Sequence, residues 1–289
     1  MASEFVRQLI DSGIHFGHRA SRWNPKMKPY IYGKRNLIHI IDIRETVKGL
    51  LRAKKFITQV VARGDDVLFV GTKRQAREAI EKYATSVEMP FVAERWLGGT
   101  LTNFRTIRSR LARLEELEAI EADGRITEYS KKQVARITRE RRKIHRNLAG
   151  IRKMTKLPGA LVVIDVRREH IAVKETKVLG IPTVCLIDTD SDPDYADIPI
   201  PGNDDAMRSI DIILKHMAEA VTEGQRGRTA GDEQAAETAR KRSRRATLAR
   251  ADDSVPQEPA VEDSEVATGE HAVEPSETPA TPAVPESSP

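Results

Sequence analysis

A dense cluster of cations lies between Lys131 and Lys156. This segment contains eleven Lys or Arg residues and a single acid, Glu140. A solvated helix face normally mixes both signs, whereas charges of one sign repel one another until an anionic partner neutralises them. The imbalance therefore favours an anionic partner, most simply nucleic acid, over a merely solvated surface.

A second group of cations is interleaved with aromatic rings between Gly13 and Tyr32. Its members are His15, Phe16, His18, Arg19, Arg22, Trp23, Lys26, Lys28, Tyr30 and Tyr32. Cations neutralise phosphate, and flat rings stack on exposed bases, so this mixture suits RNA. The alternative is that the rings fix an irregular arm to the domain while the cations stay in water. Glycine and proline interrupt the stretch too often for regular secondary structure to be expected.

Two glycine-containing loops can also meet anions. Val70-Gly-Thr-Lys-Arg-Gln follows an apolar run and opens a helical segment, where backbone N–H groups can hold a phosphate. It lacks the glycine spacing of a P-loop or a dinucleotide fingerprint, so we favour an RNA phosphate contact over a nucleotide site. The loop from Arg95 to Arg105 contains Gly98-Gly99, which permits a sharp turn, and its terminal arginines are available for anions.

An acidic loop, Asp188-Thr-Asp-Ser-Asp-Pro-Asp, has carboxylates at alternate positions. It is not a calcium loop, because Pro193 and Pro199 stand where such a loop needs glycine and glutamate. A single Mg²⁺ held by Asp188 with Asp204 or Asp205 is one interpretation, and carboxylates capping the last helix are the other. No Ser/His/Asp or Cys/His arrangement stands out, so the sequence does not predict an enzyme.

The main cation cluster lies on the second arm of a predicted helical hairpin. The arms cover 104–122 and 130–156, each with one narrow apolar seam, which suits an antiparallel pair. Gly124 permits the left-handed conformation that ends the first helix. Ser130 and Gln133 have the spacing of a capping box that starts the second.

The remaining elements alternate between strand and helix. Apolar runs at 37–41, 67–70, 91–92, 160–166 and 183–187 predict strands, and helical periodicity follows at 43–63, 74–85, 169–179 and 204–223. A short amphipathic helix is expected at 3–12. Strands without polar alternation are typical of a parallel sheet covered on both faces. The sequence thus predicts an α/β fold: a doubly wound, three-layer parallel sheet with the hairpin inserted between its third and fourth strands.

The composition divides the chain into parts. We expect an α/β RNA-binding domain over 1–103 and 158–225, the inserted hairpin over 104–157, and a tail over 226–289 that is acidic at its end and disordered. The whole chain carries net +5, but residues 1–225 alone carry net +10, as expected of a protein that meets polyanions. The single cysteine excludes an internal disulfide. Neither a secretory signal nor an apolar run of membrane-spanning length is apparent, so we expect a cytoplasmic protein.

Several long motifs resemble the bacterial small-subunit ribosomal protein S-two family. They are Gly13-Ile-His-Phe-Gly-His-Arg, Trp23-Asn-Pro-Lys-Met-Lys-Pro-Tyr-Ile, Phe69-Val-Gly-Thr-Lys-Arg-Gln-Ala, Arg95-Trp-Leu-Gly-Gly-Thr-Leu-Thr-Asn-Phe and Ile198-Pro-Ile-Pro-Gly-Asn-Asp-Asp-Ala. The resemblance covers residues 3–224 in the family's order. One departure is Asp190, where the family usually has asparagine, and the tail lies outside the resemblance.

The resemblance implies a non-catalytic, structural constituent of the small ribosomal subunit. It further implies contacts with ribosomal RNA and neighbouring ribosomal proteins, and a docking base for the mRNA-binding ribosomal protein S-one. The implied fold is flavodoxin-like with a coiled-coil protrusion. No nucleotide or redox cofactor, membrane contact or homo-oligomer is expected. The alternative from the residues alone is a phosphate-ligand enzyme that uses the 71–73 loop and Asp188.

The sequence and the resemblance together predict two sets of site residues. The RNA-binding residues are Arg19, Arg22, Lys26, Lys28, Lys73, Arg74, Arg77, Arg95, Arg105, Arg108, Lys131, Lys132, Arg136, Arg139, Arg142 and Lys143. The partner-docking residues are Phe5, Phe16 and Trp23.

Overall fold

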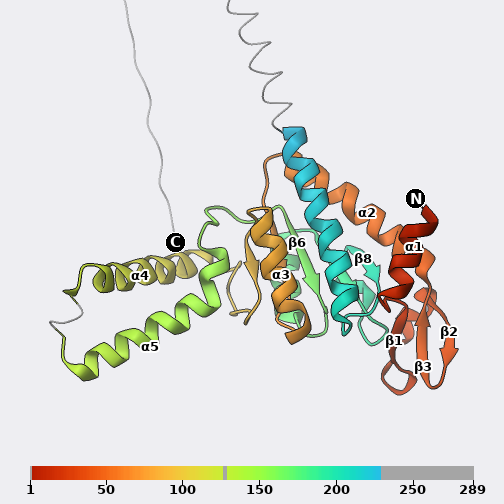
Figure 1. Cartoon of the computed structure of the whole chain (residues 1–289), viewed down its shortest axis with the longest axis horizontal. Helices are drawn as coiled ribbons and strands as arrows, with labels where there is room; N and C mark the ends of the chain where they lie inside the picture. The colour runs from red at the N-terminus through yellow and green to blue at the C-terminus, as the bar shows by residue number, and fades with distance from the viewer. Residues whose placement is uncertain (1, 126–128, 229–289) are drawn as a thin grey trace, which may run out of the picture. The chain divides into compact units, whose positions relative to one another are not determined.

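The computed structural model describes residues 2–125 and 129–228 (Figure 1). All of these belong to one unit, Met1–Thr238. The predicted tail therefore lies outside the described residues from 229 onward. Residues 226–228 are described, and they continue the last helix, which covers 207–228.

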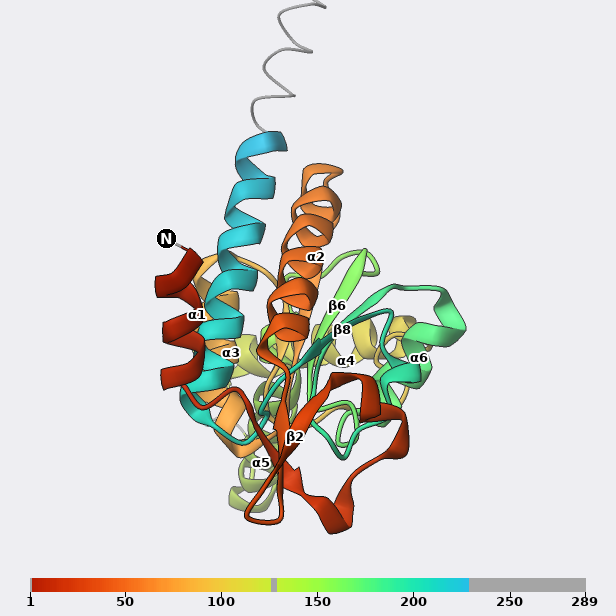
Figure 2. The same cartoon turned by 90° about the vertical axis from the view of Figure 1, so that its right-hand side faces the viewer.

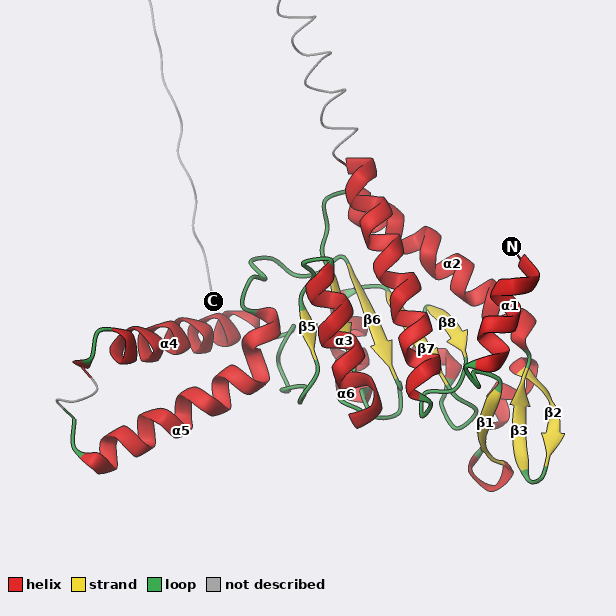
Figure 3. Ribbon diagram, in the orientation of Figure 1, coloured by secondary structure: helices red, strands yellow, loops and turns green. Residues whose placement is uncertain are grey.

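A five-stranded parallel sheet lies at the centre of the fold (Figure 3). Its strands are β4 (Val67–Val70), β5 (Phe91–Val92), β6 (Ala160–Ile164), β7 (Thr183–Ile187) and β8 (Ile198–Pro201). They pair in the order β5-β4-β6-β7-β8, and every pair is parallel. The order in which successive strands are added therefore reverses between β4 and β6, and ligands bind at this switch point in many doubly wound folds.

Helices cover both faces of this sheet, which confirms the predicted three layers. Phe69 and Val162 pack on one face against α1 (Ala2–Asp11), α2 (Ile43–Ala62), α3 (Arg74–Ser86) and helix 207–228. Leu68 and Val163 pack on the other face, with α6 (His170–Leu179) and the base of the hairpin (Figure 2). Successive residues of a strand point to opposite faces, so a strand buried on both sides is apolar throughout.

The assignment of 37–41 to this sheet was wrong. Ile38–Ile41 is a strand, β3, but it pairs antiparallel with β1 (Phe16–Arg19) and β2 (Ile31–Arg35) in a separate three-stranded sheet. The fifth strand of the parallel sheet is β8, which was not predicted. Proline lacks an N–H donor and is confined to sheet edges, and β8 with its two prolines is an edge strand.

Regular structure also occurs in the stretch from Gly13 to Tyr32, where none was expected. Besides β1, it contains two 3-10 helices, η1 (Ala20–Arg22) and η2 (Pro25–Tyr30). Asn24 caps η2 by accepting a hydrogen bond from the Lys26 N–H. Proline is compatible with the start of a short helix, so its presence did not exclude structure.

The hairpin is present, between β5 and β6. Helix α4 covers Phe104–Ala122, and α5 covers Lys131–Leu148. Gly124 has the expected positive φ of 71°, and both hydrogen bonds of the Ser130–Gln133 capping box are formed. The insertion follows the second strand of the parallel sheet along the chain, because β3 belongs to the other sheet.

The second arm ends earlier than predicted. After Leu148 the chain forms a short 3-10 helix, η4 (Ala149–Ile151), instead of continuing to Lys156. A side chain at Gly150 would clash with the backbone carbonyl of Phe91 in β5. The close approach of this glycine to the sheet therefore fixes the place where the hairpin returns to the domain.

Candidate nucleic-acid interface

The cations of α5 lie on the face opposite its apolar seam. Val134, Ile137 and Ile144 are half-buried and Leu148 is buried, and they share one side of the helix. At about 100° per residue, the outward cations occupy an arc of roughly 140° on the other side. These exposed residues are Lys131, Lys132, Arg136, Arg139, Arg142, Lys143 and Arg146. We call them the α5 cation face.

Several acids among the described hairpin residues pair between its two arms rather than on this face. Glu140 lies 3.6 Å from Arg113 of α4, and Arg152 pairs with Glu118 at 2.9 Å. Arg141 pairs with Glu121. Within the described part of the chain, no member of the α5 cation face forms an ion pair. A hollow of about 380 Å³ opens among Lys132, Gln133, Arg136 and Arg139. The face is thus an uncompensated positive strip.

The predicted RNA-binding cations near the hairpin base differ in whether they have partners within the chain. Arg74, Arg95 and Arg105 are exposed. Arg77 pairs with Glu94 at 3.0 Å, and Arg108 donates to the carbonyl of Met154 at 3.1 Å. The first three are therefore free to meet an anion, whereas the last two also have structural contacts.

The predicted cations of the N-terminal segment likewise include some that are exposed and one that is paired with acids of the chain. Arg19, Arg22 and Lys28 are exposed. Lys26 is exposed too, but its ammonium contacts Asp192 at 2.9 Å and Asp194 at 2.5 Å. The Asp194 carboxylate raises the pKa of Lys26. Lys26 thus links η2 to the acidic loop that was considered as an ion site.

Lys73 lies in an unexpected environment. Its ammonium is 2.7 Å from Asp204, 2.6 Å from Asp205 and 3.4 Å from Asp165. Burial alone would lower the pKa of Lys73, but these carboxylates outweigh it and the pKa is raised. Burial raises the pKa of Asp204 to about 7. The cation predicted to face RNA phosphate is therefore engaged with acids at the carboxyl end of the sheet.

A second carboxylate binds the same loop at Thr72, the residue before Lys73. Glu169 is buried and accepts hydrogen bonds from the Thr72 N–H at 2.7 Å and the Thr72 hydroxyl at 2.6 Å. Burial raises the pKa of Glu169. The backbone N–H that would face a bound phosphate thus has an internal partner. At the crevice between β4 and β6, where doubly wound folds bind ligands, Thr72 and Lys73 thus contact Glu169 and Asp165 of the same chain.

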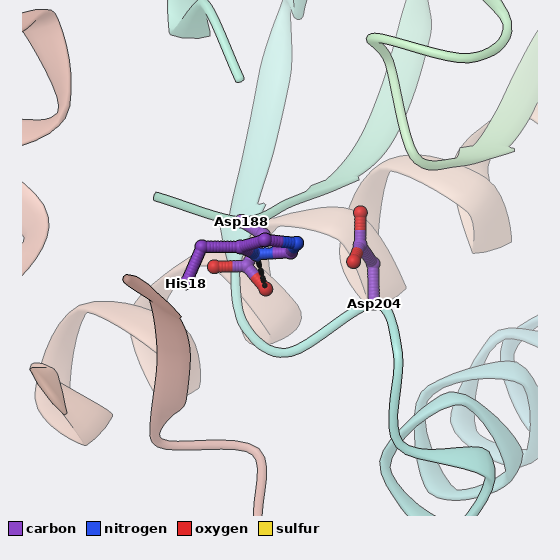
Figure 4. A group of neighbouring side chains, drawn as sticks. All are labelled: His18, Asp188 and Asp204. Carbon is purple, nitrogen blue, oxygen red and sulfur yellow. Dashed lines mark ion pairs between the residues drawn. The ribbon is translucent and has the colours of Figure 1, made fainter. Parts of the chain in front are cut away.

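Three side chains at this edge can share a cation (Figure 4). The ligand atoms of His18, Asp188 and Asp204 all lie within 4.8 Å of one another. His18 Nδ1 is 2.9 Å from Asp188, and this carboxylate raises the pKa of His18 to about 9. An imidazole with two carboxylates suits a transition metal better than Mg²⁺, which prefers oxygen ligands.

Two of the three carboxylates considered for Mg²⁺, Asp188 and Asp204, lie close together, and His18 lies beside them. Asp205 is exposed and contacts Lys73 and His18 Nε2. His18 and Asp188 are 170 positions apart in the chain, so spacing gave no signal for this contact. The ammonium of Lys73 already supplies one positive charge to the group.

The three predicted docking aromatics differ in exposure. Phe16 is 47% exposed, with its ring 4.1 Å from that of His15. Phe5 is half-buried and packs edge-on against His216, and Trp23 is half-buried against His39. Of the three, Phe16 alone is exposed, with about half of its surface accessible.

Comparison with known proteins gives one consistent family. The family model described as Ribosomal protein S2 matches residues 9–224. A Small ribosomal subunit protein uS2 from Rhodopirellula baltica is 60% identical over 224 residues, which cover 78% of this chain and 86% of the relative. Relatives of the same name from Mycobacterium ulcerans and Syntrophobacter fumaroxidans are 52% and 51% identical, over 79% and 78% of this chain and 83% and 82% of their own length. The chain therefore belongs to the ribosomal protein S2 family, the structural proteins of the small ribosomal subunit.

Proposed function

We propose that the chain binds small-subunit ribosomal RNA, chiefly through the α5 cation face. The observation that carries this proposal is the segregation of charge on the hairpin. Glu118, Glu121 and Glu140 pair between the arms, and the α5 cation face has no carboxylate partner among the described residues. Such a strip gains affinity by releasing counterions from phosphates.

The exposed cations near the hairpin base and in the N-terminal segment extend this interface. Arg74, Arg95 and Arg105 lie near the base, and Arg19, Arg22 and Lys28 lie in the N-terminal segment. Lys26, Lys73, Arg77 and Arg108 have internal partners and contribute more weakly. The strand order, equivalent to 2-1-3-4-5 within the parallel sheet, supports a flavodoxin-like domain over 1–103 and 158–225. The paired seams support a coiled-coil hairpin over 104–157.

The salt dependence of binding tests the contact. We expect Arg139→Ala with Lys143→Ala to weaken binding of small-subunit ribosomal RNA and to lower the slope of log affinity against log salt by about one unit per lost phosphate contact. The matched control is Arg52→Ala with Lys55→Ala, two exposed cations of α2 one turn apart without an ion pair in the described structure. Equal slopes for the two double variants would contradict the proposal.

Docking of ribosomal protein S-one is a second proposed role, and the exposure of Phe16 favours it. Aromatic side chains that bury against a partner often dominate binding energy. We expect Phe16→Ala to weaken capture of this protein at least tenfold without changing the RNA salt slope. Tyr32→Ala is the control, because Tyr32 is 72% exposed on β2, the other edge strand of the same three-stranded sheet. A larger loss with Tyr32→Ala would place the docking contact elsewhere.

A further inference from the structure

The turn that leads into the hairpin is folded around a single buried carboxylate. Glu175 of α6 is 7% exposed. Its Oε1 accepts hydrogen bonds from the Trp96 indole at 3.1 Å and the Gly99 N–H at 2.8 Å. Its Oε2 accepts from the Leu101 N–H at 3.0 Å and from the Thr102 N–H and hydroxyl at 3.1 and 3.2 Å. One side chain thus satisfies five donors of residues 96–102.

The sequence of this turn is suited to the carboxylate. Gly99 has a φ of 87°, a left-handed conformation that is costly for any other residue. The N–H groups of Gly99, Leu101 and Thr102 converge on the carboxylate, while the Thr100 N–H donates to the Leu97 carbonyl. Burial alone would raise the pKa of Glu175, but the donors of Thr102, Trp96, Leu101 and Gly99 outweigh it and the pKa is lowered. The group is therefore an ionised carboxylate, and its hydrogen bonds are charge-assisted.

The turn is joined to the hairpin with almost no intervening chain. Only Asn103 separates Thr102 from the start of α4 at Phe104. The Asn103 N–H donates to the Gly99 carbonyl at 2.9 Å, so the last residue before the helix is also fixed to the turn. Helix α6 is held against the sheet by Ala172 and Val173, which are fully buried. The carboxylate therefore connects a rigid element to the root of the hairpin.

We propose that Glu175 is the positioning residue for the hairpin: its carboxylate fixes the turn 96–102 and thereby the direction in which α4 and α5 leave the sheet. This inference rests on the proposed RNA contact of the α5 cation face. A hairpin free to swing presents the same cations but engages fewer phosphates at once. Glu175 touches no RNA itself in this account and acts through the hairpin.

Glu175→Gln is the direct variant, because it keeps the shape but places an amide donor among N–H donors. We expect it to raise the RNA dissociation constant about tenfold and to lower the salt slope by about one unit or more. Exchange of the Gly99, Leu101 and Thr102 amides with solvent should accelerate. Glu169→Gln is the matched control, because Glu169 precedes the same helix, is also buried and accepts hydrogen bonds from Thr72 instead.

A double-mutant cycle separates positioning from general damage. If Glu175 acts through the α5 cation face, Glu175→Gln costs less affinity in the Arg139→Ala/Lys143→Ala background than in the wild type. Additive losses would overturn the inference. If Glu175→Gln does not fold, Trp96→Phe with Thr102→Val removes two of the donors, and a wild-type salt slope despite faster amide exchange would overturn it too.

A distance measurement decides the inference even if the RNA proposal fails. Spin labels at Arg139→Cys on α5 and Lys55→Cys on α2 report the direction of the hairpin. The native Cys185 will not react, because it is buried and burial raises its pKa to about 12. We expect the distance distribution to broaden in Glu175→Gln and to stay narrow in Glu169→Gln. An unchanged distribution in Glu175→Gln would refute the positioning role, whereas wild-type RNA binding by Arg139→Ala/Lys143→Ala would refute the proposed RNA contact alone.

Discussion

Lys73 joins the ends of three strands of the parallel sheet. It follows β4, and its carboxylate partners follow β6 and β8. Removing one member of a buried ion pair leaves the other charge without compensation, which costs more than the pair contributed.

Lys73→Met tests this network at the level of one residue. We expect a loss of about 2–4 kcal/mol in the free energy of unfolding, because Asp204 is left buried without its cation. Urea unfolding at pH 7 measures it. Lys55→Met, on the exposed face of α2, should change stability by less than about 0.5 kcal/mol. Addition of Asp204→Asn should restore part of the loss, and a change below about 1 kcal/mol for Lys73→Met would contradict the account.

His18 makes the stability depend on pH. Its pKa is raised from 6.5 to about 9 by Asp188, so its stabilisation is fully present below pH 6.5 and is lost as the pH rises through about 9. The difference in unfolding free energy between wild type and His18→Gln should therefore shrink by up to about 3 kcal/mol from pH 6 to pH 9.5. Chemical denaturation at several pH values measures this. A difference that stays constant over that range would show that the ion pair has no energetic role.

These residue-level contacts mark the limit of prediction from the sequence. The loop containing Lys73 was correctly placed at a strand end, but its partners could not be identified. Lys73 and Asp204 are 131 positions apart, and residue types show no preference for one distant acid over another. Glu175 was missed for the same reason, since a glutamate in a helical segment carries no signal of burial.

The hairpin is the element whose stability can be tested separately from the sheet. Leu114 and Leu117 are completely buried between the arms. We expect Leu114→Ala to lower the opening free energy of α4 and α5 amides by about 2–4 kcal/mol in hydrogen exchange, because it leaves a cavity in the seam. Amides of β4 and β6 should be unaffected. Leu51→Ala is the control, since Leu51 of α2 is 59% exposed. Equal loss of protection in β6 would show that the hairpin and the sheet unfold together.

Elements with strong local patterns were predicted well. The predicted bounds of the first hairpin arm, 104–122, agree with α4, and the capping box set the start of α5 correctly. The incorrect assignments concern segments whose sheet membership or end is set by contacts between residues far apart in the chain. The run at 37–41 is β-prone in either sheet, and β8 was hidden by two prolines that an edge strand tolerates. The end of α5 depends on the contact of Gly150 with β5, which no local pattern reveals.

The whole molecule is a structural protein rather than an enzyme, and its place is the small ribosomal subunit in the cytoplasm, as its family membership shows. No helix among the residues that the structure describes is long and apolar enough to cross a membrane. The fold is consistent with this role, because the crevice between β4 and β6 contains Thr72, Lys73 and Glu169 in internal contacts. Within the described residues, the seven exposed cations of the α5 cation face lie together on the inserted hairpin without an ion pair.

Competitive incorporation into small ribosomal subunits tests the central claim most directly. Differently tagged wild type and Arg139→Ala/Lys143→Ala are mixed in equal amounts with subunits lacking this protein, and the bound ratio is measured after sedimentation at increasing salt. We expect the wild type to exceed the hairpin variant, with an excess that grows with salt. The Arg52→Ala/Lys55→Ala control should stay near parity with wild type. Parity for the hairpin variant at every salt concentration would contradict the claim that the α5 cation face holds the RNA.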